Sequence, residues 1–404
     1  MTPDRTSSDA GRGLARGGLK SHSSKYRRDI QGLRALAVAL VVLVHASVPG
    51  FAGGFIGVDV FFVISGFVIT ELLLRQPRRT LATNLGHFYA RRVRRIVPAA
   101  TLVLVATAFS AYLLLGANFE SSLLIDVRWA SLFGANIRLI NTGSNYFIPG
   151  VAPSLVTHYW SLAVEEQFYI VYPLIVFTLV RVAPPRLRTR VVGGFLLLAI
   201  VASAWYSWHL SSINAVEAYY SPFTRFWELA LGGLVSLVPL AWVRRTPRLN
   251  AALALAALLA LFAAVYRLDV HSVFPGTLAW WPCAACATLL VTGVASAKGA
   301  PSTWLSWRPL CYLGDISYSL YLWHYPWLML PLQRVHPLGS DGARIVEVAG
   351  ALLCAVLSYH LIENPIRYSR RLANDGVATA MLLVIGVSTS WVATLVVARL
   401  AHVG

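Results

Sequence analysis

The stretch QGLRALAVALVVLVHASVPG, residues 31–50, decides the fold class of this chain. It is long and apolar enough for a membrane-spanning helix, yet it carries Arg34 near its start and His45 near its end. Eleven residues separate the two, about three helical turns, so they lie on nearly the same helix face about 16 Å apart in depth. Because an ionisable side chain inside a membrane is costly, both are expected to face a protein interior or an aqueous cavity.

His45 is the first candidate for a catalytic residue. A histidine can take up a proton near neutral pH, so His45 could act as a general base. A histidine that only forms a hydrogen bond inside a helix bundle would fit the same pattern, and the spacing alone leaves both interpretations open.

The composition extends the membrane interpretation to the whole chain. Hydrophobic residues make up 57% of the 404 residues, charged residues only 13%, and the mean hydropathy is +0.63. Apolar segments of spanning length recur along almost the whole sequence, which predicts an all-α, polytopic transmembrane helix bundle. We expect about eleven spans, near residues 32–49, 56–74, 96–115, 161–180, 191–209, 226–243, 250–266, 278–296, 314–332, 344–362 and 377–398.

The distribution of basic residues predicts the orientation. If the spans alternate, most of the 34 lysines and arginines fall in loops on one side, and the positive-inside rule then places the N-terminus in the cytoplasm. The same bias accounts for the net charge of +17 without a nucleic acid as partner.

Two regions differ in composition. Residues 1–28 are rich in Gly, Ser and Arg and are expected to form a disordered basic tail, whereas residues 29–404 form the transmembrane domain. No cleavage site is evident, so the first apolar segment is expected to remain as a helix. The long connection of residues 116–159 contains several Asn and Pro, which indicates an ordered outer loop folded back over the helices.

Two further features have a structural and a chemical interpretation. Asp59, at the outer start of the second span, could fix the tautomer of His45 or could simply cap its helix. Cys283 and Cys286 have CxxC spacing, but no second pair or adjacent histidine completes a metal site. We therefore expect buried thiols and no metal.

A group of arginines precedes the third span. Arg91, Arg92, Arg94 and Arg95 lie against the inner membrane surface, where guanidinium groups can bind phosphate in a bidentate manner. Anchoring to anionic lipid head groups is the alternative, and charge alone favours it.

The fourth and ninth spans carry polar side chains at positions where a membrane helix normally has none. Glu165, Glu166 and Gln167 begin the fourth span, and we expect Glu165 and Gln167 to contact the substrate. Because adjacent residues point about 100° apart, only one of the two carboxylates is expected to face a given cavity. In the ninth span, residues such as Tyr318, Ser319 and His324 could line a site for a hydroxylated ligand. An aromatic belt is the alternative for the ninth span, but His324 is too deep for the interface.

The order of these segments resembles acyltransferase family 3, the multi-span bacterial O-acyltransferases. The resemblance rests on six motifs that follow one another in the family's order and cover nearly the whole chain. They are RDIQGLRALAV (28–38), GGFIGVDVFFVISGF (53–67), FYARRVRRIVP (88–98), YWSLAVEEQFY (159–169), SYSLYLWHYP (317–326) and ENP (363–365).

The resemblance implies a reaction and roles for several residues. The family's catalytic histidine corresponds to His45 and its motif arginine to Arg34, and Arg92 and Arg95 match the paired arginines associated with the donor. An acyl group, acetyl or another short acyl, would pass from acyl-CoA to a hydroxyl of a cell-envelope sugar, glycan or glycolipid. A multi-pass location in the inner membrane, among its lipids, is implied as well.

Two alternatives stay open. The acceptor could instead be a macrolide-type secondary metabolite, and many relatives add an external SGNH hydrolase-type domain that this chain is expected to lack. A transporter or flippase would also carry charges inside the membrane. For that class, movement of the substrate would survive the substitution His45→Ala and no acylation would occur.

Overall fold

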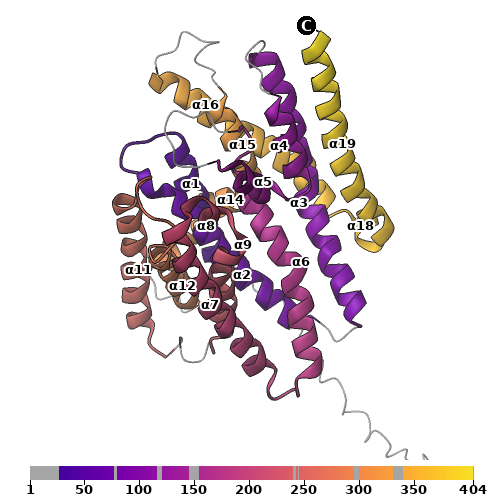
Figure 1. Cartoon of the computed structure of the whole chain (residues 1–404). Helices are drawn as coiled ribbons and strands as arrows, with labels where there is room; N and C mark the ends of the chain where they lie inside the picture. The colour runs from indigo at the N-terminus through magenta and orange to yellow at the C-terminus, as the bar shows by residue number, and fades with distance from the viewer. Residues whose placement is uncertain are drawn as a thin grey trace, which may run out of the picture.

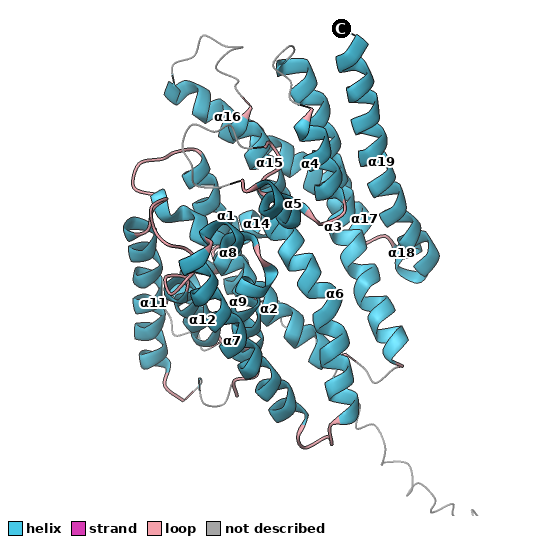
Figure 2. Ribbon diagram, viewed as in Figure 1, coloured by secondary structure: helices cyan, strands magenta, loops and turns pink. Residues whose placement is uncertain are grey.

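The computed structural model of this chain describes residues 27–76, 80–115, 121–144, 154–239, 243, 245–294, 300–330 and 340–403. Every element in this described part is a helix, which confirms the predicted all-α class (Figure 2). The predicted basic tail lies outside the described residues except for Arg27 and Arg28, and the first helix begins at Arg28.

The helices form one bundle in which long elements run roughly alongside one another (Figure 1). In chain order they are α1 (Arg28–His45), the 3₁₀ turn η1 (Ala52–Ile56), α2 (Gly57–Leu74), α3 (Leu81–Leu115), α4 (Ser122–Ser131), α5 (Ala135–Thr142), α6 (Tyr159–Val182), α7 (Arg188–Ile213), α8 (Ala215–Tyr220), α9 (Pro222–Val235), α11 (Pro247–Arg267), α12 (Trp280–Thr292), α13 (Pro301–Leu305), α14 (Arg308–Asp315), α15 (Ser317–Met329), α16 (Ser340–Ser358), the π-helical turn η4 (Tyr359–Glu363), α17 (Asn364–Arg367), α18 (Arg370–Asn374) and α19 (Gly376–Val403).

Each of the eleven predicted spans overlaps one of these helices. Seven helical segments in the described part are long and apolar enough to cross a membrane: η1–α2, α3, α6, α7, α11, α16–α17 and α19. The other four, α1, α9, α12 and α15, are shorter or carry charge, since α9 has 14 residues and α12 and α15 have 13 each. The structure thus supports a multi-pass helical protein, and the number of crossings stays a prediction.

The first span lies inside the bundle. Helix α1 contacts α2, α13, α14 and α15, and most of its Ala, Val and Leu side chains are buried. Small residues permit close approach between neighbouring helices: a Cβ atom on Gly66 of α2 would lie 1.8 Å from the carbonyl oxygen of Leu229 in α9. Arg34 and His45 of α1 contact Ser317 and His324 of α15.

The predicted outer loop is ordered where the structure describes it, at residues 121–144 and 154–159. Helix α4 packs against α3 and α19, and α5 packs against α6. Asn136 of α5 is buried and donates to the carbonyl oxygen of Tyr220 at 3.3 Å. The loop therefore folds back over the helices, as expected.

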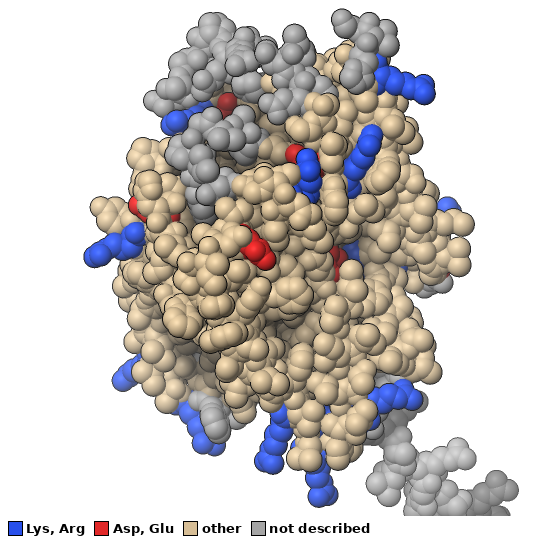
Figure 3. All heavy atoms as spheres, in the orientation of Figure 1, with Lys and Arg blue, Asp and Glu red and all other residues tan. Residues whose placement is uncertain are grey.

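Charged side chains are absent from a broad band across the visible face. Lys and Arg side chains lie on both sides of this band, at the end of the molecule that holds the C-terminus and at the opposite end (Figure 3). A wide uncharged band is what lipid-facing helices present.

Candidate functional site

A cavity of about 220 Å³ lies between α1, α2, α3, α6 and α15. Its apolar wall comes mainly from α2, and its polar wall is made by residues from several helices. The polar lining consists of Gln31, Arg34, Ser65, Arg92, Arg95, Ser161, Glu165, Tyr169, Ser317, Tyr318, Tyr321 and Arg367.

Four guanidinium groups, of Arg34, Arg92, Arg95 and Arg367, share this lining with one carboxylate. In the described part of the chain, only Arg367 among the four has a carboxylate oxygen within ion-pair distance, that of Glu363 at 4.0 Å. The cavity is therefore strongly cationic, and half-buried positive charge of this kind favours an anionic ligand.

The lining arginines are held in place by neutral partners. Arg34 donates to the Oγ of Ser317 at 2.9 Å. The guanidinium of Arg92 lies over the ring of Tyr169, 3.9 Å from its centre, a cation–π contact. These contacts orient the guanidinium groups without neutralising them.

The predicted arginine group divides in the structure. Arg92 and Arg95, three residues apart on one face of α3, line the cavity, whereas Arg91 is exposed and lies outside the lining. Arg94 is buried and donates to the carbonyl oxygen of Leu372 at 2.9 Å. Only part of the group can thus contact a ligand in the cavity.

The two adjacent carboxylates of α6 also divide, as their spacing predicts. Glu165 lines the cavity and accepts hydrogen bonds from the hydroxyls of Ser65 and Tyr169, while Glu166 is not part of the lining. Gln167 was expected at the substrate, but its amide donates to Asn136 at 2.9 Å. Because this contact ties α6 to α5, Gln167 supports the outer loop instead.

On α15, the expected hydroxyl groups separate in the same manner. Tyr318 lines the cavity and donates to the carbonyl oxygen of Ile96 at 2.8 Å. Ser319 lies outside the lining and donates to Glu363 at 2.7 Å, and the serine in the cavity is Ser317.

His45 lies in a second group of polar side chains, a histidine cluster formed by His45, His158 and His324. The Nδ1 atom of His45 is 3.2 Å from the Nε2 atom of His324, whose Nδ1 lies 2.6 Å from the carbonyl oxygen of Tyr321. His158 stacks on the ring of Tyr325 with 4.9 Å between ring centres. The first span thus brings its histidine against two others, from the start of α6 and from α15.

A single aromatic residue connects the cavity with the histidine cluster. The ring of Tyr321 lines the cavity and lies 5.4 Å from the ring of His324. Its hydroxyl donates to the carbonyl oxygen of His158 at 3.0 Å. Since Phe61 packs edge-on against the same ring at 6.2 Å, an aromatic layer separates the arginines from the histidines.

Residues 27–363 match the family model of acyltransferase family 3, which is described as an acyltransferase domain. The chain belongs to this family.

Several curated proteins are similar to it. YrhL of Bacillus subtilis, named as a candidate peptidoglycan O-acetyltransferase, is 34% identical over 364 residues. The peptidoglycan O-acetyltransferase OatA of Listeria monocytogenes and the O-acetyltransferase OatA of Staphylococcus aureus are each 30% identical. The matches cover 86% of this chain but 56% to 58% of the relatives, so the chain spans little more than half of their length. No solved structure matches the chain.

The position of Asp59 in this family member differs from the expected one beside His45. Its carboxylate accepts a hydrogen bond from Arg225 at 2.8 Å, and the same guanidinium nitrogen donates to Glu228 at 2.9 Å. The physical reason is the depth at which the helices meet: a Cβ atom on Gly57 would lie 2.3 Å from the carbonyl oxygen of Ala37, so α2 begins well below the end of α1. We therefore do not retain the Asp59–His45 pair.

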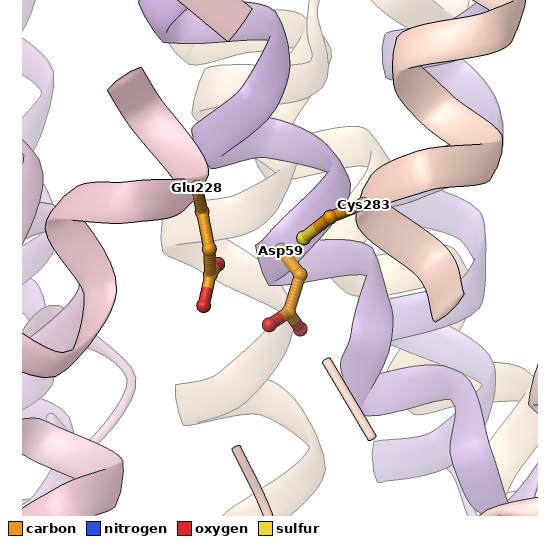
Figure 4. A group of neighbouring side chains, drawn as sticks. All are labelled: Asp59, Glu228 and Cys283. Atoms are coloured by element: carbon orange, nitrogen blue, oxygen red, sulfur yellow. The ribbon is translucent and has the colours of Figure 1, made fainter. Parts of the chain in front are cut away.

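Asp59, Glu228 and Cys283 point toward one another from α2, α9 and α12 (Figure 4). One ligand atom from each lies within 4.8 Å of the others, a spacing that a metal ion could use. However, the buried guanidinium of Arg225 already provides a positive charge to both carboxylates. We interpret the group as an internal ion-pair network that joins α2 to α9.

Sequence reasoning missed His158 and Ser65 as members of the site, whereas Tyr321 belongs to the polar and aromatic ninth span that was expected to line it. His158 directly precedes the motif YWSLAVEEQFY, and the rule that singled out His45, a histidine at the outer end of a span, applies to it as well. Ser65 carries no such signal, because a serine is an ordinary residue of a membrane helix until its partners are known.

Proposed function

We propose that this chain is a membrane O-acyltransferase that moves a short acyl group, acetyl by analogy with the names of its relatives, from acyl-CoA to a hydroxyl of a cell-envelope glycan. The observation that carries the proposal is the cavity lined by four guanidinium groups and one carboxylate. The phosphates of CoA supply the negative charge that this lining requires, and Arg92 and Arg95 offer the bidentate contacts that suit them.

The cavity would hold only a part of the donor. At about 220 Å³ it is smaller than the roughly 300–1,000 Å³ of sites that enclose a drug-sized ligand. The phosphates would therefore bind near the arginines, and the acylated arm would extend past the aromatic layer toward the histidines.

His45 serves as the general base in this proposal. It takes the proton of the acceptor hydroxyl, the oxygen attacks the thioester carbonyl, the carbon–sulfur bond breaks, and the thiolate leaves. The acylated arm of the donor would extend from Arg34 to His45, which lie on one helix about 16 Å apart in depth.

The topology completes the proposal. With eleven crossings and a cytoplasmic N-terminus, the arginine cavity opens toward the cytosol, where acyl-CoA is found, and the histidine cluster lies toward the outer face of the inner membrane. Such an arrangement suits a glycan acceptor outside the cell.

Purified protein in liposomes, supplied with radiolabelled acetyl-CoA and soluble oligomers of N-acetylglucosamine, tests the reaction. We expect label in the oligomer as an ester that mild base releases, and free CoA in equal amount. Movement of the oligomer across the membrane without acetyl transfer, in wild-type and His45→Ala protein alike, would assign the chain to the transporters instead.

A further inference from the structure

We infer that His324 is a positioning residue that fixes the tautomer of His45, so that the Nε2 atom of His45 is the base. The inference rests on the proposed function, because it assumes that His45 takes up the proton of the acceptor. It changes the role expected for His324, which the sequence suggested as a contact to the substrate.

The argument begins at the backbone of α15. The Nδ1 atom of His324 lies 2.6 Å from the carbonyl oxygen of Tyr321, and a carbonyl oxygen can only accept a hydrogen bond. Nδ1 of His324 therefore carries the ring's hydrogen. A neutral imidazole has one N–H group, so Nε2 of His324 has a lone pair.

That lone pair determines the state of His45. The Nε2 atom of His324 is 3.2 Å from the Nδ1 atom of His45, and a hydrogen bond between two nitrogens needs one donor and one acceptor. Because Nε2 of His324 accepts, Nδ1 of His45 donates and carries the hydrogen of that ring. The lone pair of His45 is then at Nε2.

The surroundings keep His324 in this arrangement. Its side chain is 0% exposed, and the rings of His45, His158 and Tyr321 lie 5.1, 5.5 and 5.4 Å from its own. A ring packed on several sides cannot turn over to exchange its nitrogens without displacing its neighbours. The backbone of α15 thus acts, through one buried ring, on which nitrogen of His45 is basic, together with the hydrogen bond between the His45 ring and the backbone of Val41 in α1.

The same contact acts during the reaction. When Nε2 of His45 takes the proton from the acceptor hydroxyl, the ring becomes an imidazolium, and its Nδ1–H still donates to His324. A hydrogen bond from a charged donor is stronger than one between neutral groups, so the contact stabilises the protonated base more than the resting one. His324 itself gains no proton in this step.

Three substitutions of His324 separate positioning from packing. In His324→Gln the side-chain oxygen can stand where Nε2 was and accept from His45. In His324→Asn the polar atoms stand near the former Nδ1 and no acceptor faces His45, and His324→Met fills the space without any acceptor of comparable strength. His209 of α7, exposed and stacked on Trp205, provides a control in His209→Met.

The variants are compared in liposomes with acetyl-CoA and N-acetylglucosamine oligomers, with thermal unfolding measured in parallel. We expect kcat to fall about 10- to 100-fold in His324→Met and His324→Asn, the effect of losing one hydrogen bond to a charged group. The KM for acetyl-CoA should stay unchanged, and His324→Gln should recover most of the lost kcat. His209→Met should match the wild type.

Wild-type kcat in folded His324→Met or His324→Asn, or equal losses in the Gln and Asn variants, would overturn the inference. Should His324→Met not fold, the comparison of Gln with Asn decides alone. His45→Ala is measured beside them: if it is inactive while His324→Asn is fully active, only the inference fails. If His45→Ala is fully active, the proposed base fails and the inference fails with it.

Discussion

Replacement of Arg95 by alanine should weaken binding of the acyl donor and leave the chemical step largely intact. Arg95 lines the cationic cavity together with Arg92, and neither has a carboxylate within salt-bridge distance among the described residues. A phosphate group that binds there replaces water around both guanidinium groups. Under the proposed reaction, loss of one guanidinium removes contacts to the donor without removing a contact to the acceptor.

The size of the effect follows from the strength of such contacts. A hydrogen bond to a charged group contributes about 1.5–3 kcal/mol, and each 1.4 kcal/mol corresponds to about a tenfold change in affinity. Arg95→Ala should thus raise the KM for acetyl-CoA about 10- to 100-fold. Arg95→Lys should recover only part of this loss, since an ammonium group lacks the planar pair of donors.

Initial rates in liposomes, with acetyl-CoA varied at a fixed concentration of N-acetylglucosamine oligomer and then the reverse, measure both KM values. Arg91→Ala is the matched control, because Arg91 lies on the same helix but is exposed and outside the cavity. Equal increases of the donor KM in Arg91→Ala and Arg95→Ala would mean that the group only anchors the protein to anionic lipid. An increase confined to the acceptor KM would refute the assignment of the cavity to the donor.

Three further outcomes are expected. His45→Ala should lower kcat about 10²- to 10⁴-fold in protein that folds normally, as loss of a general base does, and turnover near the wild-type rate would exclude that role. In sealed vesicles, acetyl-CoA should be used only when it is supplied to the cytosolic face, and acetylated oligomer should form on the other side. Arg225→Met should destabilise the protein by about 3–5 kcal/mol, because two buried carboxylates lose their shared partner; an unchanged thermal unfolding temperature would contradict this.

The fold class could be predicted because the hydropathy of each long segment is a local property. The bounds of α6 and α19 lie within a few residues of the predicted spans. That only one of Glu165 and Glu166 lines the cavity could be predicted for a similar reason, since helical geometry alone points adjacent side chains in different directions. Whether short or charged helices such as α1 and α15 cross the membrane depends on how they pack against neighbouring helices. The hydropathy of a segment gives no information about that packing.

Contacts between helices could not be predicted, and the failures have a common cause. The sequence predicts that Asp59 lies close to His45, because both residues flank the short connection between the first two spans. In the structure, α2 starts at the level of Ala37 and not at the level of His45. His324 is 279 residues away from His45 in sequence, and only the rotation of α15 about its axis brings the two rings together. The identity and spacing of residues in the sequence can therefore indicate which residues belong to a site, but not which of them are in contact.

The separation of arginines and histidines along α1 constrains the mechanism further. Arg34 belongs to the cavity, His45 belongs to the histidine cluster, and Tyr321 touches both. A phosphate bound beside Arg34 cannot itself approach His45, so only a ligand with an extended arm can serve both places. Under the proposed reaction, substitutions at the cavity should therefore change donor KM, substitutions in the histidine cluster should change kcat, and only Tyr321, which lies between them, should change both.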